Sequence, residues 1–224
     1  MEIVVKLKNV SKNFKDAEVL KNISVEFEKG KIHGIIGRNG SGKSILFKTI
    51  CGFIHIDTGE IWIRDKKLWR DIDMPSNVGI IIDSSGFLPY YSGLKNLKFL
   101  ASLNGKIDVN KIRETMSKVG LDPNSRKHVS KYSLGMRQRL SIAQAIMEDQ
   151  DIIILDEPMN GLDKNGVKDI RKILLDLKNE NKTIILASHN TEDIEALCDN
   201  VYEMESGVLT ALHNGNQEVK KYPE

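Results

Sequence analysis

The chain has 224 residues, enough for one α/β domain or for a core domain that carries a small inserted one. Its 33 lysines and arginines nearly balance its 31 aspartates and glutamates, which excludes the basic surface expected of a protein that binds nucleic acid. The two cysteines, Cys51 and Cys198, stand beside apolar residues without metal-ligand spacing, so buried reduced thiols in a cytosolic protein are favoured over a disulfide or a metal site.

Two strands open the predicted fold. Residues 3–10 alternate in part between apolar and polar, and residues 19–27 repeat the pattern, so an antiparallel pair around a turn near residues 15–17 is expected. Phe14 lies on this turn, just ahead of a glycine-rich loop. From its position alone, Phe14 suits equally a ring that stacks on a purine and an ordinary core phenylalanine.

A phosphate-binding loop is predicted within residues 31–48, which read KIHGIIGRNGSGKSILFK. An apolar strand leads into the glycine-rich residues 37–44, and helical periodicity follows. Glycines allow backbone angles closed to other residues, so successive N–H groups can surround a phosphate at the positive end of the helix dipole. An ordinary glycine-rich turn would match the four fixed positions in about one chain in a hundred of this length, which strongly favours nucleotide binding.

This loop supplies most of the predicted ligand-binding residues. Lys43 is expected to reach the β- and γ-phosphates of a nucleotide, and the Ser44 hydroxyl is expected to hold Mg²⁺. The residues assigned to the nucleotide here are Gly37, Arg38, Asn39, Gly40, Ser41, Gly42, Lys43 and Ser44.

The middle of the chain changes from strands to helices. Residues 58–65 read as a turn and a strand, and residues 78–82 as a buried strand that ends in Asp83. From residue 84 to residue 149 apolar side chains recur at helical spacing, which predicts a mainly helical insertion with a helix cap at Asp108. Ser133 begins its last helix and, by itself, reads as an N-cap.

A second pair of candidate site residues follows a buried strand within residues 151–158, which ends in Asp156 and Glu157. Two charges at the end of an apolar strand are costly unless a cation or a ligand meets them, and Mg²⁺ with a nucleophilic water would do so. A turn, a helix over residues 164–178 and a strand over residues 183–187 come next. The strand closes on His189, which alone reads as an ordinary hydrogen-bonded loop residue.

The chain ends with a short helix over residues 191–198 and a hairpin over residues 201–212. The polar residues 213–224 are expected to fray.

Taken in order, these motifs resemble the nucleotide-binding subunit of an ABC (ATP-binding cassette) transporter over nearly the whole chain. Residues 37–44 match the Walker A motif and residues 152–156 match Walker B. The resemblance implies that Glu157 is the catalytic carboxylate, that residues 160–163 form the D-loop and that His189 is the switch histidine at the γ-phosphate. Lys43 completes the catalytic residues. The resemblance also implies that Phe14 stacks on adenine and that Asp156 joins Ser44 at Mg²⁺.

Two positions depart from the family. Residues 132–136, YSLGM, stand where the family has its LSGGQ signature, and they keep Ser133 and Gly135 as the implied contacts to a γ-phosphate. This form is similar to that of small exporter-type subunits, including peptide-antibiotic and multidrug resistance ATPases. Asp83 replaces the usual Q-loop glutamine, and its carboxylate can approach Mg²⁺ or its water.

The implied fold is α/β: a P-loop NTPase core with a mixed, mainly parallel sheet, an N-terminal antiparallel β subdomain and an inserted α-helical subdomain. The whole chain, residues 1–224, then forms a single cassette. Residues 1–83 and 150–212 would form the core, residues 84–149 the helical insertion, and residues 213–224 a polar tail.

The implied function is hydrolysis of ATP, with Mg²⁺, to drive export by a separately encoded membrane permease. The N-terminal residues do not follow the charged-then-apolar order of a signal peptide, and no apolar run approaches the roughly 20 residues of a membrane-spanning helix. The permease is therefore expected to hold the chain at the inner face of the cell membrane. Two such cassettes are expected to pair, as a homodimer, over bound ATP, without nucleic acid. The alternatives are a soluble ABC-type ATPase of translation, DNA repair or iron–sulfur assembly, and a P-loop kinase or GTPase, which would leave residues 133–135 unexplained.

Overall fold

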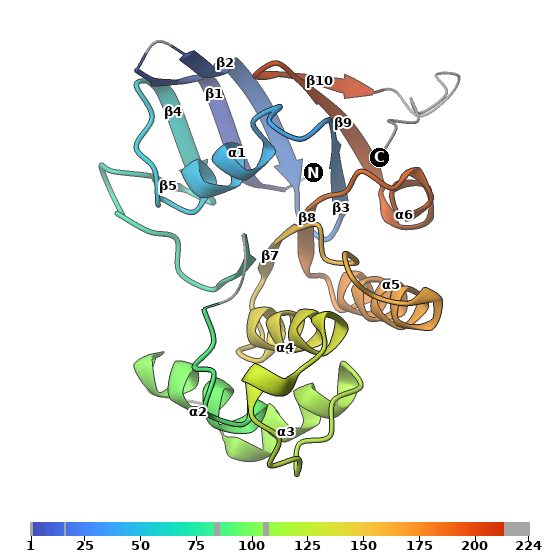
Figure 1. The fold of residues 1–224 in the computed structure, drawn as a ribbon. Helices are drawn as coiled ribbons and strands as arrows, with labels where there is room; N and C mark the ends of the chain where they lie inside the picture. Colours follow the sequence, from blue (N-terminus) through green and yellow to red (C-terminus); the bar gives the residue numbers. More distant parts are fainter. Residues whose placement is uncertain (1, 16, 83–85, 105–107, 213–224) are drawn as a thin grey trace.

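The computed structural model describes residues 2–15, 17–82, 86–104 and 108–212. Figure 1 shows an antiparallel sheet at the top, a second sheet that runs through the centre, and a group of helices at the bottom. The strands come from both ends of the chain, whereas the bottom helices come from its middle. This arrangement is the α/β fold with an inserted helical part that the sequence predicts.

The smaller sheet has the strand order β2-β1-β4-β5, and its neighbours pair antiparallel. Its strands are β1 (Ile3–Phe14), β2 (Ala17–Glu28), β4 (Thr58–Ile63) and β5 (Lys66–Lys67). Strands β1 and β2 extend beyond the predicted ranges, because Asn13 pairs with Glu18 and Phe14 with Ala17 past the end of the apolar alternation. Backbone pairing continues there although neither face is fully buried.

The larger sheet has the strand order β10-β9-β3-β8-β7-β6. Within the described part of this larger sheet only the β9–β10 pair is antiparallel, so the sheet is mixed and mainly parallel, as predicted. Ligand sites in such sheets lie at the carboxyl ends of the parallel strands. The strands are β3 (Ile32–Ile36), β6 (Val78–Ile81), β7 (Ile152–Asp156), β8 (Thr183–Ala187), β9 (Asn200–Glu205) and β10 (Val208–Leu212).

The helices divide between the sheets and the insertion. Helices α1 (Lys43–Ile50), α5 (Lys164–Asn179) and α6 (Thr191–Leu197) belong to the strand-rich part (Figure 1). The insertion contains α2 (Gly93–Asn104), α3 (Val109–Lys118), a 3₁₀ turn (Val129–Lys131) and α4 (Leu134–Ile146). Both predicted caps are confirmed, since Asp108 accepts from the Asn110 N–H at 3.0 Å and Ser133 from the Met136 N–H at 3.2 Å.

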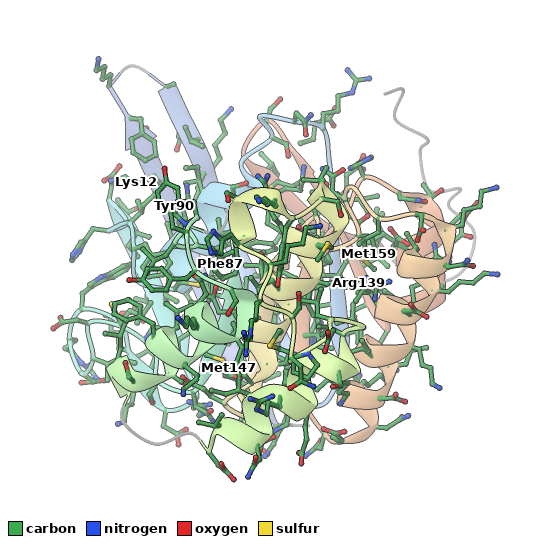
Figure 2. The ribbon with its side chains drawn as sticks, turned by 60° about the horizontal axis from the view of Figure 1, so that its bottom comes forward. Lys12, Phe87, Tyr90, Arg139, Met147 and Met159 are labelled. Carbon is green, nitrogen blue, oxygen red and sulfur yellow. The ribbon has the colours of Figure 1, made fainter. Side chains whose placement is uncertain are left out.

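Helix α4 joins the insertion to the larger sheet. A Cβ atom on Gly79 of β6 would lie 1.9 Å from the Ala145 carbonyl oxygen, so α4 packs against β6 at backbone contact. Arg139 of α4 (Figure 2) donates to the Val119 carbonyl at 2.6 Å and to Asp169 of α5 at 3.1 Å. The boundary near residue 149 therefore separates segments that share one apolar core, and the division of the chain there stays a prediction.

The two cysteines are free thiols, as predicted. Cys51 is buried and Cys198 is half-buried, and burial raises the pKa of each thiol to about 12. Neither side chain therefore offers a reactive thiolate near neutral pH. None of the described helices combines the length and the hydropathy of a bilayer-spanning segment.

His33, which is fully buried in β3, gives the fold a dependence on pH. One ring nitrogen lies 2.9 Å from the Glu28 carbonyl and the other 3.3 Å from the Asn200 amide nitrogen, an arrangement that the neutral ring satisfies. Burial lowers the pKa of His33, although the Glu28 carbonyl and the Glu28 and Asp199 carboxylates oppose that shift.

We expect the free energy of unfolding to fall as the pH drops below about 6.5, the ordinary pKa of histidine, because the unfolded chain then binds a proton that the folded chain excludes. Urea unfolding at pH 7.5 and 5.5 measures this difference. The His33→Gln variant, which keeps an amide donor for Glu28, should show a smaller fall. An equal fall in both proteins would assign the pH dependence to other groups.

Candidate active site

The predicted phosphate loop joins β3 to α1 at the carboxyl edge of the larger sheet. Gly42, with φ of 114°, adopts a backbone conformation that other residues rarely reach, and a Cβ atom there would lie 2.9 Å from the Val19 carbonyl oxygen. Gly40, with φ of 79°, differs, because no described atom lies within 4 Å of a Cβ built on it. The loop is therefore packed behind Gly42 and open at Gly40.

Lys43 is buried at the start of α1. Its ammonium donates to the carbonyl oxygens of Gly37 at 2.7 Å and Arg38 at 3.1 Å. Burial lowers the pKa of Lys43, and the carboxylates of Glu157 and Asp156 oppose this shift. The lysine is thus held inside the loop that it is predicted to serve, with its cation facing two carboxylates.

The two residues predicted at Mg²⁺ meet directly. The Ser44 hydroxyl donates to the Asp156 carboxylate at 2.5 Å, although the two residues are 112 positions apart in the chain. Ser44 lies in the first turn of α1 and Asp156 is the last residue of β7. This pair provides a hydroxyl and a carboxylate oxygen, which are the ligand types that Mg²⁺ prefers.

Glu157 and His189 also meet. His189 Nδ1 lies 2.8 Å from Glu157 Oε2. Glu157 has φ of 50° and its N–H donates to the Ala187 carbonyl at 3.0 Å, which fixes its backbone beside the end of β8. Its second oxygen, Oε1, is buried without a hydrogen-bond partner among the described residues. A buried, unpaired carboxylate oxygen is costly, so this atom is suited to accept a hydrogen bond from a water or a ligand.

Lys43, Ser44, Asp156 and Glu157, but not His189, face one pocket of about 540 Å³, within the range of small-molecule sites. It is lined by Val19, Asn39, Gly40, Gly42, Lys43, Ser44, Ile45, Leu134, Gln138, Asp156, Glu157 and Asn160. Ser133 and Gly135 line a different pocket, of about 560 Å³, together with residues 161–163 of the predicted D-loop, just before α5. Leu134 lines both. The structure therefore brings the Walker residues together and keeps the predicted signature residues apart from them.

Phe14 lies at the end of β1, partly exposed, and does not line the phosphate-loop pocket. The Lys12 ammonium lies 5.4 Å from its ring centroid. Asp57 holds the end of β1 in place, since its carboxylate accepts from the Lys12 ammonium at 2.7 Å and from the Asn13 N–H at 2.6 Å. The adenine contact of Phe14 stays a prediction.

Asp83 lies outside the described residues, so its predicted approach to Mg²⁺ is not tested. The sequence interpretation assigned no role to Gln138, which the structure places in the pocket wall. Its amide donates to the Pro158 carbonyl at 2.9 Å, just after Glu157. Its position three residues after Gly135, on one helix face, was the available signal.

The residues present fit a nucleotide and Mg²⁺. The open face of Gly40, the buried Ser41 hydroxyl, which has no hydrogen-bond partner within the described part of the chain, and the Lys43 cation suit phosphate oxygens. No group of three or more His, Cys, Asp or Glu side chains is arranged so that it could hold a metal ion by itself in the described ranges. Mg²⁺ at nucleotides needs only one or two protein oxygens, because phosphates and water complete its coordination.

We expect Lys43→Ala to weaken ATP binding by about 10- to 100-fold, because it removes charge-assisted hydrogen bonds worth about 1.5–3 kcal/mol. Equilibrium binding of a fluorescent ATP analogue measures this change. Lys172→Ala, at an exposed position of α5, is the matched control and should bind the analogue like the unaltered protein. Unchanged affinity in Lys43→Ala would contradict the phosphate role of this lysine.

The family model described as "ABC transporter" matches residues 20–160. The ABC transporter ATP-binding protein YybJ of Bacillus subtilis is 45% identical, over 92% of this chain and 94% of its own length. The bacitracin transport ATP-binding protein BcrA of Enterococcus faecalis is 37% identical, over 100% of this chain and 74% of its own. The lantibiotic transport ATP-binding protein SrtF of Streptococcus pyogenes is 31% identical, over 97% and 95%.

Solved structures show the same fold. The dimeric bacterial ABC transporter cassette MJ0796 superposes with a TM-score of 0.83 at 23% identity, covering 92% of this chain and 96% of its own. The protein cbiO1 from Clostridium perfringens, part of an ABC transporter complex, gives a TM-score of 0.79 at 27% identity, covering 93% and 87%. Family match, relatives and fold agree with the geometry of the phosphate loop and its carboxylates. The chain therefore belongs to the ABC transporter family, as an ATP-binding subunit that hydrolyses ATP to drive transport.

Proposed function

We propose that this chain is the ATPase subunit of a peptide-antibiotic exporter, and that the pocket beside the phosphate loop performs its hydrolysis. One observation carries the chemistry: the Ser44–Asp156 and Glu157–His189 contacts link residues from distant segments at one edge of the larger sheet. Lys43 and the loop N–H groups bind the β- and γ-phosphates, while Ser44 and Asp156 hold Mg²⁺, which neutralises phosphate charge.

Glu157 orients the attacking water in this proposal. Its Oε1 atom, buried and without a partner among the described residues, accepts a hydrogen bond from the water, while Oε2 stays with His189. His189 then stabilises charge on the γ-phosphate from a half-exposed loop position. We assign the water to Glu157 and the phosphate charge to His189 because the Glu157 carboxylate is more buried than the His189 imidazole.

A second copy of the chain completes each site. Ser133 and Gly135 lie at the N-terminal, positively polarised end of α4, in a pocket separate from Lys43. This end of α4 can bind an anion, and the γ-phosphate held by another cassette would supply one. The dimeric assembly of the fold neighbour MJ0796 supports this arrangement. A homodimer suffices, because one chain carries both halves of the site.

A membrane permease binds on the surface formed by α2 and the segment before it. Large apolar side chains are exposed there on the segment before α2 and on α2 itself: Leu88, Tyr90, Tyr91, Phe99 and Leu103. Figure 2 shows Tyr90 with Phe87 on this segment. Several exposed apolar residues on neighbouring segments mark a protein interaction site. The partner would hold the chain at the cytoplasmic face of the membrane.

The cargo class comes from the relatives, two of which are named for bacitracin and lantibiotic transport. We expect a strain that lacks this chain to become several-fold more sensitive to bacitracin or to a lantibiotic. Expression of the unaltered chain should restore resistance, and expression of Glu157→Gln should not. Unchanged sensitivity to both peptides would contradict this cargo class, whereas the ATPase activity of the purified chain would remain as the separate test of the chemistry.

A further inference from the structure

The loop that carries His189 is attached to α5 through a buried ion pair. We infer that Arg171 and Asp193 are positioning residues for hydrolysis, which hold His189 against Glu157 through Ser188. This inference rests on the catalytic roles proposed for His189 and Glu157. It adds an ion pair whose described contacts include neither His189 nor Glu157.

The ion pair is short, and its carboxylate is buried whereas the Arg171 side chain is partly exposed. Arg171 Nη2 lies 2.6 Å from Asp193 Oδ1, and Arg171 Nε donates to the same oxygen at 2.8 Å. Asp193 is 2% exposed, and removing the cation that pairs with a buried carboxylate is strongly destabilising. Glu192 lies 3.7 Å from Arg171 but is well exposed, and solvent screens that contact. The pair therefore ties the first turn of α6 firmly to α5.

Ser188 connects the ion pair to the loop. The Ser188 hydroxyl donates to Asp193 Oδ2 at 3.4 Å, and Ser188 Oγ accepts from the Asn190 N–H at 3.1 Å. Ser188 is 2% exposed. His189 stands between Ser188 and Asn190, so both of its neighbours are restrained by this one hydroxyl. The side chain of Asn190 caps α6 by accepting from the Glu192 N–H. Asp193 is therefore not required as the helix cap.

His189 needs this support because its ring is half exposed. A half-exposed ring gains little positional restraint from packing, so the path of the loop sets its distance from Glu157. Arg171 lies on α5, which begins directly after the predicted D-loop. The pair thus couples the placement of His189 to the helix that follows the D-loop.

Steady-state hydrolysis of Mg-ATP by the full chain tests the inference. Arg171→Met removes the charge and keeps the length, and Ser188→Ala removes the hydroxyl without leaving a buried charge. We expect each to lower kcat roughly tenfold, with KM for ATP changed less than twofold, since misplacement of a catalytic group affects the chemical step. Arg171→Lys, which keeps the charge, should retain most of the activity.

The matched control is Lys178→Met, because Lys178 lies on the same helix and pairs with Asp199 at 2.5 Å, away from the loop of His189. It should change thermal stability and leave kcat unchanged. If Arg171→Met fails to fold, as judged by circular dichroism, Ser188→Ala decides the matter.

A double-mutant cycle separates positioning from general stability. In the His189→Ala background, Arg171→Met and Ser188→Ala should cause no further loss of kcat. Losses that multiply, or a normal kcat in both single variants, would overturn the positioning role. An unchanged kcat in His189→Ala alone would overturn the role proposed for His189, and this inference with it, so the two failures are distinguishable.

Discussion

Glu157→Gln should bind ATP with near-normal affinity and hydrolyse it roughly 10³-fold more slowly. The substitution keeps the shape of the side chain but removes the carboxylate that is expected to orient the attacking water. Lys43, Ser44 and Asp156, which hold the phosphates and Mg²⁺ in the proposed mechanism, keep the contacts described above. Phosphate release at saturating Mg-ATP measures the rate, and binding of a fluorescent ATP analogue measures affinity.

The structure supplies a control for this substitution. Glu180→Gln makes the same chemical change at the end of α5, on an exposed side chain whose carboxylate lies 3.5 Å from Lys118. It should leave turnover unchanged, since surface ion pairs contribute little. Near-native turnover in Glu157→Gln would show that another group orients the water.

Ser133→Arg should abolish an ATP-dependent dimer. In the Glu157→Gln background, where hydrolysis is blocked, the chain should run as a 25.3 kDa monomer without nucleotide and as a dimer with Mg-ATP. An arginine at residue 133 would fill the pocket that Ser133 and Gly135 line, and it would remove the cap of α4. Size-exclusion chromatography with light scattering measures the mass in each state.

Ser117→Arg is the matched control, because Ser117 is exposed in the last turn of α3 and does not line the signature pocket. It should dimerise normally. Loss of the Ser133 cap costs about 1 kcal/mol, so a thermal melt must show that Ser133→Arg remains folded. A dimer that persists in Ser133→Arg would contradict the signature assignment. If the Glu157→Gln parent forms no dimer, the homodimer is contradicted and pairing with a different cassette is indicated.

Features encoded within a few neighbouring residues could be read from the sequence. The strand–loop–helix of residues 32–50 follows from glycine content and periodicity, and the caps at Asp108 and Ser133 follow from short-range hydrogen bonds. The strand at Thr183–Ala187 was predicted with its observed bounds, because a short buried apolar run has clear ends. The family resemblance then supplied the order of the motifs and the α/β fold.

Some local features escaped the sequence interpretation for physical reasons. The ends of β1 and β2 are held by backbone pairing, which leaves no apolar pattern in the side chains. Strand β5 has two residues, too few for any periodicity. The buried Arg171–Asp193 pair reads in the sequence as two ordinary charges of amphipathic helices.

The sequence by itself determined which residues can bind phosphate, hold a metal or activate water. Only the tertiary structure decided which of them meet. Strand β8 lies between β3 and β7, so His189 and Glu157 come together across 32 residues, and Ser44 and Asp156 across 112. It also decided that Ser133 and Gly135 line a separate pocket from Lys43. Periodicity and spacing report local conformation, whereas these contacts depend on strand order and on how α4 packs against β6, which no local pattern encodes.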